Sequence, residues 1–201
     1  TSVQVHGAGT LIISQGSTPS LVVEGKRPVL DRLTTTTSGD SLVLEPHGVW
    51  YAPITYSGAD RVTYHLTVTE LTGIEAHGAI RIESAQPLTT DDLALSTSGA
   101  THLSLELSGQ TVTVRASGAG EITLSGSAEV LDFKSSGAAK LHARDLAAQR
   151  ATIDCSGAAK VEVNASQELN VALSGAGRVS YAGDPHLTQS ISGAGKVERM
   201  E

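Results

Sequence analysis

The sequence lacks the features that mark several large classes of protein. Aromatic residues make up only 3% of it, Cys155 is its one cysteine, and no apolar run approaches the roughly 18 residues of a membrane helix. The net charge is −7, so the chain has no excess of Lys and Arg of the kind that binding to a phosphate backbone requires. These absences exclude an internal disulfide and a membrane span in this chain, and they argue against a nucleic-acid partner.

What the chain has instead is a repeat. The tripeptide Ser-Gly-Ala, or a close variant of it, recurs at intervals of 18 to 21 residues. The repeated glycines are Gly58, Gly78, Gly99, Gly118, Gly137, Gly157, Gly175 and Gly193. A period near twenty residues is typical of one coil of a solenoid.

Alignment on the repeated glycine indicates which side chains are buried. An aliphatic residue follows each glycine by four positions, in the series Val62, Ile82, Leu103, Ile122, Leu141, Val161, Val179 and Val197. A second alternating set precedes the glycine, as in Val112, Val114 and Ala116 before Gly118. Alternation with a period of two is typical of strands with one buried face. The pattern predicts an all-β parallel solenoid, a β-helix, in which two strands of each coil meet at the glycine corner.

The corner residues are expected to have structural roles. Glycine adopts positive φ without steric cost, and we expect it to do so at Gly118, Gly137 and Gly157. Stacked coils would also align the preceding serines into a hydrogen-bonded ladder of hydroxyls. These serines are Ser98, Ser117, Ser136, Ser156, Ser174 and Ser192. Six identical serines cannot all be nucleophiles, so a catalytic role is not expected of them.

The first part of the chain does not follow the period. Segments 3–5, 10–13, 20–23 and 41–44 are predicted to be strands, separated by turns at 15–19 and 38–40. We therefore divide the chain into N-terminal strands that cap the solenoid, residues 1–56, and repetitive coils, residues 57–201, within one structural domain. An atypical end of this kind shields the open end of a solenoid.

A basic stripe lies three residues after the glycines. Its members are Arg61, Arg81, His102, Glu121, Lys140, Lys160, Arg178 and Lys196. Because the next position is buried, these side chains are expected to face outward. We take Arg81, Lys140, Lys160, Arg178 and Lys196 as candidate ligand-binding residues for an acidic glycan. The alternative is ordinary solubilising charge, balanced by Glu83, Glu162 and Glu198 two positions along.

The few aromatic residues form a second candidate site. Trp50, Tyr51 and Tyr56 lie close together in a loop rich in proline. Aromatic rings cover the faces of sugars well, so these three residues are candidates for ligand contact. The alternative is that they plug the open end of the solenoid.

Several blocks of the sequence resemble one protein family. They are VHGAGTLIISQG at 5–16, LSGAGRVSYAGDP at 173–185 and SGAGKV at 192–197, together with the repeated Ser-Gly-Ala units. In these the chain resembles the putative auto-transporter adhesin, head GIN domain family of bacterial exported proteins. The resemblance implies a right-handed solenoid, export beyond the inner membrane, an adhesive or surface role and no catalytic residues. His77 in place of a corner serine and Glu121 in the basic stripe depart from the repeat.

The leading hypothesis is a non-enzymatic cell-envelope or surface protein, an adhesin-like module that binds a glycan or another envelope component. We expect it to be periplasmic, on the outer-membrane surface or extracellular, and a monomer or weak homo-oligomer. No cofactor or metal is expected, because the seven histidines show no metal-ligand spacing. The alternative is a polysaccharide-active β-helix lyase or hydrolase, which would need carboxylates or cations clustered on adjacent coils. A hexapeptide acyltransferase is disfavoured because the coil length varies.

Overall fold

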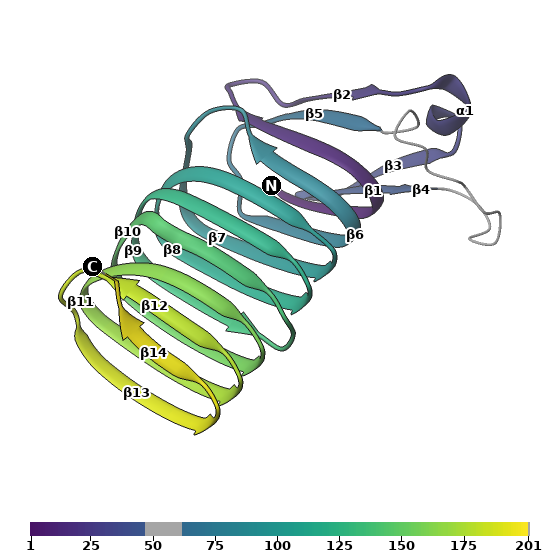
Figure 1. Cartoon of the computed structure of the whole chain (residues 1–201). Coiled ribbons are helices and arrows are strands. Elements are labelled where there is room, and N and C mark those ends of the chain that lie inside the picture. Colours follow the sequence, from purple (N-terminus) through teal and green to yellow (C-terminus); the bar gives the residue numbers. More distant parts are fainter. Residues whose placement is uncertain (47–61, 201) are drawn as a thin grey trace.

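The chain folds into a stack of parallel β coils (Figure 1). The computed structural model describes residues 1–46 and 62–200. The elements, in chain order, are β1 (Ser2–Gln15), β2 (Ser20–Glu24), α1 (Arg27–Leu30), β3 (Leu33–Ser38), β4 (Ser41–Pro46), β5 (Thr63–Val68), β6 (Gly73–Ser84), β7 (Leu88–Gly99), β8 (His102–Gly118), β9 (Glu121–Ser135), β10 (Lys140–Gly157), β11 (Lys160–Gly175), β12 (Arg178–Ala182), β13 (His186–Gly193) and β14 (Lys196–Arg199). The predicted parallel β-solenoid is confirmed.

Each coil pairs in parallel with the coil before it and the coil after it. The glycine corners define this register: Gly78 pairs with Gly99, Gly99 with Gly118, and Gly157 with Gly175. Long strands bend around the solenoid and therefore take part in both of its faces, as β8, β9, β10 and β11 do (Figure 1). An outward residue of one coil consequently stacks on its counterpart in the next, about 4.8 Å away.

The interior is a narrow column of aliphatic side chains. Ile82, Leu103, Ile122, Leu141 and Val161, all four residues after a glycine, are at most 2% exposed. The set before the glycine is buried as well, including Phe133, the one phenylalanine of the chain. Each coil contributes a few such side chains, so neighbouring coils must stack before any one of them has a core. The predicted inner columns are confirmed, except that Val197 on the last coil is only partly buried.

The corner glycines are required for two different reasons. Gly118 and Gly157 have φ values of 114° and 142°, as predicted. For Gly137 the prediction is wrong, because it is not among the glycines of positive φ. A Cβ added to Gly157 would nevertheless lie 2.5 Å from the carbonyl oxygen of Gly137, and one added to Gly137 would lie closer still to that of Gly118. Close stacking of backbone on backbone therefore excludes side chains at all three corners.

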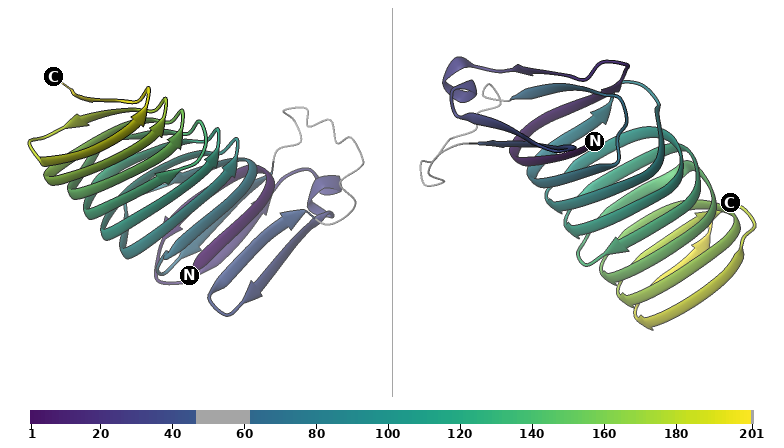
Figure 2. Two further views of the ribbon diagram at one scale, coloured as in Figure 1. Left: turned by 90° about the horizontal axis from the view of Figure 1, so that it is seen from below. Right: turned by 180° about the vertical axis from the view of Figure 1, so that it is seen from behind.

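Antiparallel strands close the N-terminal end. β1 pairs with β6 on one side and with β4 and β5 on the other, so the first strand of the chain already belongs to the stack. β2 pairs antiparallel with β5, and β3 pairs antiparallel with β4 through the turn at Gly39. Figure 2 shows these strands and α1 at the opposite end of the stack from the C-terminus. The expected boundary at residue 56 lies outside the described residues.

Candidate functional site

The basic stripe forms one outward column along the first half of each coil, just after the glycine corner. We call this side of the solenoid the first-strand face. Arg81 pairs with His102, His102 with Glu121 and Glu121 with Lys140. Lys140, Lys160, Arg178 and Lys196 then follow one another in register. All five stripe residues proposed as ligand contacts are exposed. Arg61, the first member of the stripe, lies outside the described residues.

A column of glutamates neutralises most of this stripe. Lys160 Nζ lies 2.8 Å from Glu162, Arg81 lies 3.4 Å from Glu83, and both carboxylates are two residues further along the same strand. Glu198 pairs with both Arg178 and Lys196 on the last coils. Lys140 is the one proposed stripe cation in the described chain with no carboxylate within 4 Å. The stripe is therefore a row of ion pairs and not a continuous line of positive charge.

These ion pairs change the acidity of the glutamates. A hydrogen bond from Lys160, followed by one from His142, lowers the pKa of Glu162 below its ordinary value. A hydrogen bond from Lys196 lowers the pKa of Glu198 in the same way. Both carboxylates therefore keep their negative charge in mildly acidic solution, where they continue to neutralise the cations of the stripe.

A groove opens along the second half of the coils, just before the glycine corners. We call this side of the solenoid the second-strand face and the groove the serine groove. Its volume is about 280 Å³, and it is lined by Ser96, Thr97, Arg115, Ala116, Ser117, Lys134, Ser135, Ser136, Asp154 and Ser156. Nine of these residues come from β7, β8, β9 and β10, four successive strands of the stack, and Ser136 follows β9 directly.

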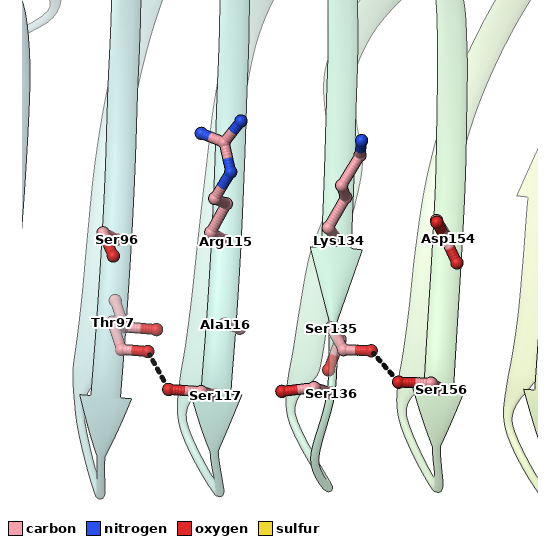
Figure 3. A pocket seen from close by; sticks show the side chains of 10 residues that line it. All are labelled: Ser96, Thr97, Arg115, Ala116, Ser117, Lys134, Ser135, Ser136, Asp154 and Ser156. Carbon is pink, nitrogen blue, oxygen red and sulfur yellow. Dashed lines mark hydrogen bonds between the residues drawn. The ribbon is translucent and has the colours of Figure 1, made fainter.

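Two cations stand side by side in the serine groove. Arg115 pairs in register with Lys134, and Lys134 with Asp154 on the next strand. Figure 3 shows the Arg115 and Lys134 side chains extending in the same direction from neighbouring strands, away from the row of corner serines. Both are exposed, and neither has a carboxylate within 4 Å among the residues the structure describes. Their positive charge is therefore available to a ligand.

The corner serines form the lower border of the groove. Ser117 donates to the carbonyl oxygen of Thr97 at 3.4 Å, and Ser156 to that of Ser135 at 3.5 Å (Figure 3). The expected ladder is wrong, because no two corner hydroxyls bond each other among the described residues, and Ser117 and Ser156 donate to the backbone of the preceding coil instead. Each donated bond is long, and each hydroxyl oxygen keeps lone pairs free to accept. The serines thus supply polar atoms beside the cations.

The sequence contained a signal for this groove. Three residues before the corner glycines stand Glu75, Ser96, Arg115, Lys134, Asp154, Ala172 and Ser190. This column alternates with buried residues and therefore faces outward, as the stripe does. The two adjacent cations of this column, Arg115 and Lys134, are the signal in the sequence that points to the groove.

Other candidate residues contribute little to a described site. Trp50, Tyr51 and Tyr56 lie outside the described residues. Burial, and after it the charge of Asp154, raises the pKa of the Cys155 thiol to about 12, so this cysteine is a buried and unreactive residue. Within residues 1–46 and 62–200, no group of histidine, cysteine and acidic residues could hold a metal ion.

Comparison with known proteins places the chain in a family. The family model described as putative auto-transporter adhesin, head GIN domain, matches residues 1–185. The chain belongs to that family. Among curated proteins, none is significantly similar to it. The resemblance noted in the sequence is thereby confirmed for the head GIN domain family.

Solved structures share the fold of this head GIN domain. A putative adhesin from Bacteroides fragilis superposes with a TM-score of 0.90 at 21% identity, covering 99% of this chain and 91% of its own. A putative lipid binding protein from Parabacteroides distasonis gives 0.76 at 18% identity, covering 100% and 92%. A putative adhesin from the same species gives 0.71 at 18% identity, covering 99% and 92%. At these identities the likeness concerns the fold.

The described part of this family member contains no helix of the length and apolarity needed to cross a membrane.

Proposed function

We propose that this chain is a surface or exported binding module that holds an anionic group of a glycan or of another envelope component in the serine groove. The observation that carries the proposal is the pair Arg115 and Lys134, adjacent in register and without an ion-pair partner in the described chain. Family membership agrees with a role at the bacterial surface, and the adhesin names of its structural neighbours agree with binding as the principal role.

The chemistry of the groove suits a carboxylate, sulfate or phosphate group. The guanidinium of Arg115 can donate two parallel hydrogen bonds to such a group, and Lys134 adds a point charge one strand away. The hydroxyls of Ser117 and Ser136 can bond the sugar or glycerol oxygens that flank the anion. Asp154 on the next strand repels a second anionic group, so a ligand with spaced charges is favoured over a dense polyanion.

The stripe is the weaker candidate for the same ligand. Its glutamates already occupy Arg81, Lys160, Arg178 and Lys196, and an incoming anion would have to displace them. Exposed ion pairs of this kind are worth at most about 1 kcal/mol, so displacement is feasible but lowers the net affinity. We therefore assign the primary contact to the groove and a secondary one to the stripe.

Charge reversal on the two surfaces tests this assignment. Binding of an oligogalacturonate, a heparin oligosaccharide and phosphatidylglycerol vesicles is measured by calorimetry at two salt concentrations. The variant Arg115→Glu with Lys134→Glu should abolish binding. The variant Lys140→Glu with Lys160→Glu carries the same charge change. It should lower affinity only about threefold, because its charges lie far from a ligand in the groove and are screened by salt.

The arms of this experiment separate the sources of the anion. Binding to the vesicles alone would assign a lipid head group, as the name of the Parabacteroides neighbour suggests for that protein. Binding to the oligosaccharides alone would assign a glycan. Loss of binding in the stripe variant but not in the groove variant, or no binding to any of the three, would overturn the proposal.

A polysaccharide lyase is the second candidate function. Such an enzyme needs cations on adjacent coils to neutralise the uronate carboxylate, and Arg115 and Lys134 meet that requirement. Among the described residues that line the groove, Asp154 is the one with a carboxylate. Incubation with polygalacturonate would give an unsaturated uronate with ultraviolet absorbance if the chain were a lyase. Binding without that absorbance would leave the binding module as the function.

A further inference from the structure

One corner serine differs from the others that the structure describes in its surroundings. Ser98 pairs in register with His77, the histidine that replaces a serine in the corner column of the preceding coil. Its Oγ lies 2.6 Å from Nδ1 of that histidine. Ser117 and Ser156, by contrast, bond only to backbone carbonyl oxygens. The chain therefore distinguishes Ser98 chemically, although its sequence context is the same Ser-Gly-Ala.

A third residue orients the histidine. Nε2 of His77 lies 2.8 Å from Oε1 of Glu75, two residues earlier on β6 and on the same outward face. The carboxylate can only accept, so Nε2 carries the proton and Nδ1 presents its lone pair to the serine hydroxyl. His6, one coil away, stacks on the His77 ring with centroids 4.9 Å apart and helps to hold its orientation. A hydroxyl, a base and an orienting carboxylate thus stand in one line.

We propose that Ser98 is an activated nucleophile that accepts acyl groups from carboxylic esters, with His77 as its base and Glu75 as the positioning residue. This arrangement of nucleophile, base and orienting group is the general requirement for covalent catalysis by serine. The inference goes beyond ligand binding and does not depend on the anionic ligand of the serine groove.

The reaction would proceed in two balanced steps. Ser98 Oγ forms a bond to the ester carbonyl carbon, and its hydroxyl proton moves to Nδ1 of His77. The bond from that carbon to the alcohol oxygen then breaks as His77 returns the proton to the leaving oxygen. Water repeats the sequence on the acyl-serine and releases the carboxylic acid. The carboxylate of Glu75 stabilises the positive charge that His77 carries between the proton transfers.

The structure also limits the rate. The backbone amide of Ala100, beyond the same corner, already donates to the carbonyl oxygen of Gly78 at 3.0 Å and is not available to an oxyanion. Ser98 should therefore gain the contribution of its base, about 10²-fold to 10⁴-fold, without that of an oxyanion hole. Reactive esters and phosphonates, rather than amides, are the substrates that fit.

A fluorophosphonate probe tests the assignment site by site. Attack forms a bond from serine oxygen to phosphorus, breaks the bond to fluorine and passes the proton to His77. Peptide mapping of the labelled protein should find the probe on Ser98 at a rate at least 100 times that on Ser174, which occupies the same corner column outside the groove and has no histidine neighbour in register. Ser98→Ala should abolish the label and Ser174→Ala should leave it unchanged.

The base has a matched variant in the repeat itself. His77→Ser restores the residue that most coils carry at this corner, so its melting temperature should stay close to that of the parent chain. Labelling of Ser98 should nevertheless fall at least 100-fold, and Glu75→Gln should slow it by a smaller factor. Equal labelling of Ser98 and Ser174, no labelling of Ser98, or an unchanged rate in His77→Ser would overturn the proposal.

Discussion

The two outward faces of the solenoid carry different numbers of cations and offer them differently. On the first-strand face, Arg81, Lys160 and Lys196 each meet a glutamate two residues along the strand, and Arg178 meets Glu198 on the next coil. On the second-strand face, Arg115 and Lys134 are followed two residues later by Ser117 and Ser136 and stay unpaired in the described chain. We therefore expect the longer cationic column to be the weaker anion site. A cation is neutralised where a neighbouring outward residue is a carboxylate, because an ion pair forms only within the reach of the two side chains.

Loss of the shared interior should break both faces together. Ile122→Asp and Leu141→Asp each place a carboxylate where the native side chain is 0% exposed. The cost of a buried unpaired charge is several kcal/mol, comparable with a whole stability of roughly 5–15 kcal/mol. Both variants should fail to show a cooperative thermal transition by circular dichroism. Near-parental melting temperatures would contradict the placement of this column in the core.

The corner that joins the two faces should be the next most sensitive element. Gly157→Ala should destabilise the fold by about 3 kcal/mol, because the new Cβ is held at positive φ and lies 2.5 Å from the carbonyl oxygen of Gly137. Gly39→Ala is the control, since Gly39 also has positive φ but no atom within 4 Å of an added Cβ. It should cost about 1 kcal/mol in urea denaturation. Equal costs would mean that stacking does not crowd the corner.

A milder change in the serine groove should sharpen the difference between the faces. Arg115→Lys keeps the charge but removes the planar pair of donors, so affinity for the oligosaccharide that binds should fall about tenfold. The equivalent exchange Arg178→Lys on the stripe should change it less than twofold. Calorimetry on the two single variants measures both values, and equal losses would make the two faces equivalent.

Cys155 lies beneath the serine groove, next to Asp154, and should respond to alkali. Its pKa is about 12 in the folded chain and 9.0 without burial, so folding disfavours the thiolate. The corresponding stability is complete below pH 9 and is lost as the pH rises toward 12. At pH 10 the loss should be about 1.4 kcal/mol, and Cys155→Ala should remove this part of the pH dependence. Parallel urea titrations of the two proteins at pH 8 and 10 show whether their curves differ.

The smallest effect is expected from the ion pairs of the stripe. Because hydrogen bonds from Lys160 and His142 lower the pKa of Glu162, its contribution is present above the ordinary glutamate range and is lost as the pH falls through the lowered value. Glu162→Gln should therefore flatten the acid limb of the stability curve by about 0.5 kcal/mol. An unchanged acid limb would show that the exposed pair adds nothing to stability.

Much of the fold followed from local pattern. The glycine period, the aliphatic residue four positions later and the alternating set before the corner predicted the parallel coils, their inner columns and the positive φ at Gly118 and Gly157. The missed corner, Gly137, shows the limit of this reasoning. Its conformation depends on how β9 passes into the next coil, and glycine is needed there because the backbone of Gly118 lies against it.

The sequence by itself determined the repeat, the inward and outward positions and the column in which each charge stands, because a strand alternates and coils of nearly equal length stack in register. Only the tertiary structure decided which of those charges are paired and which corner serine is hydrogen-bonded to a histidine. Lys160 pairs with Glu162, Arg115 and Lys134 have no carboxylate within 4 Å in the described chain, and Ser98 bonds to His77. These outcomes depend on side-chain rotamers and on the spacing between coils. Such contacts join residues that are about twenty positions apart or on alternate positions of a strand. The repeat period determines which residues are neighbours, but it does not determine which of them form hydrogen bonds.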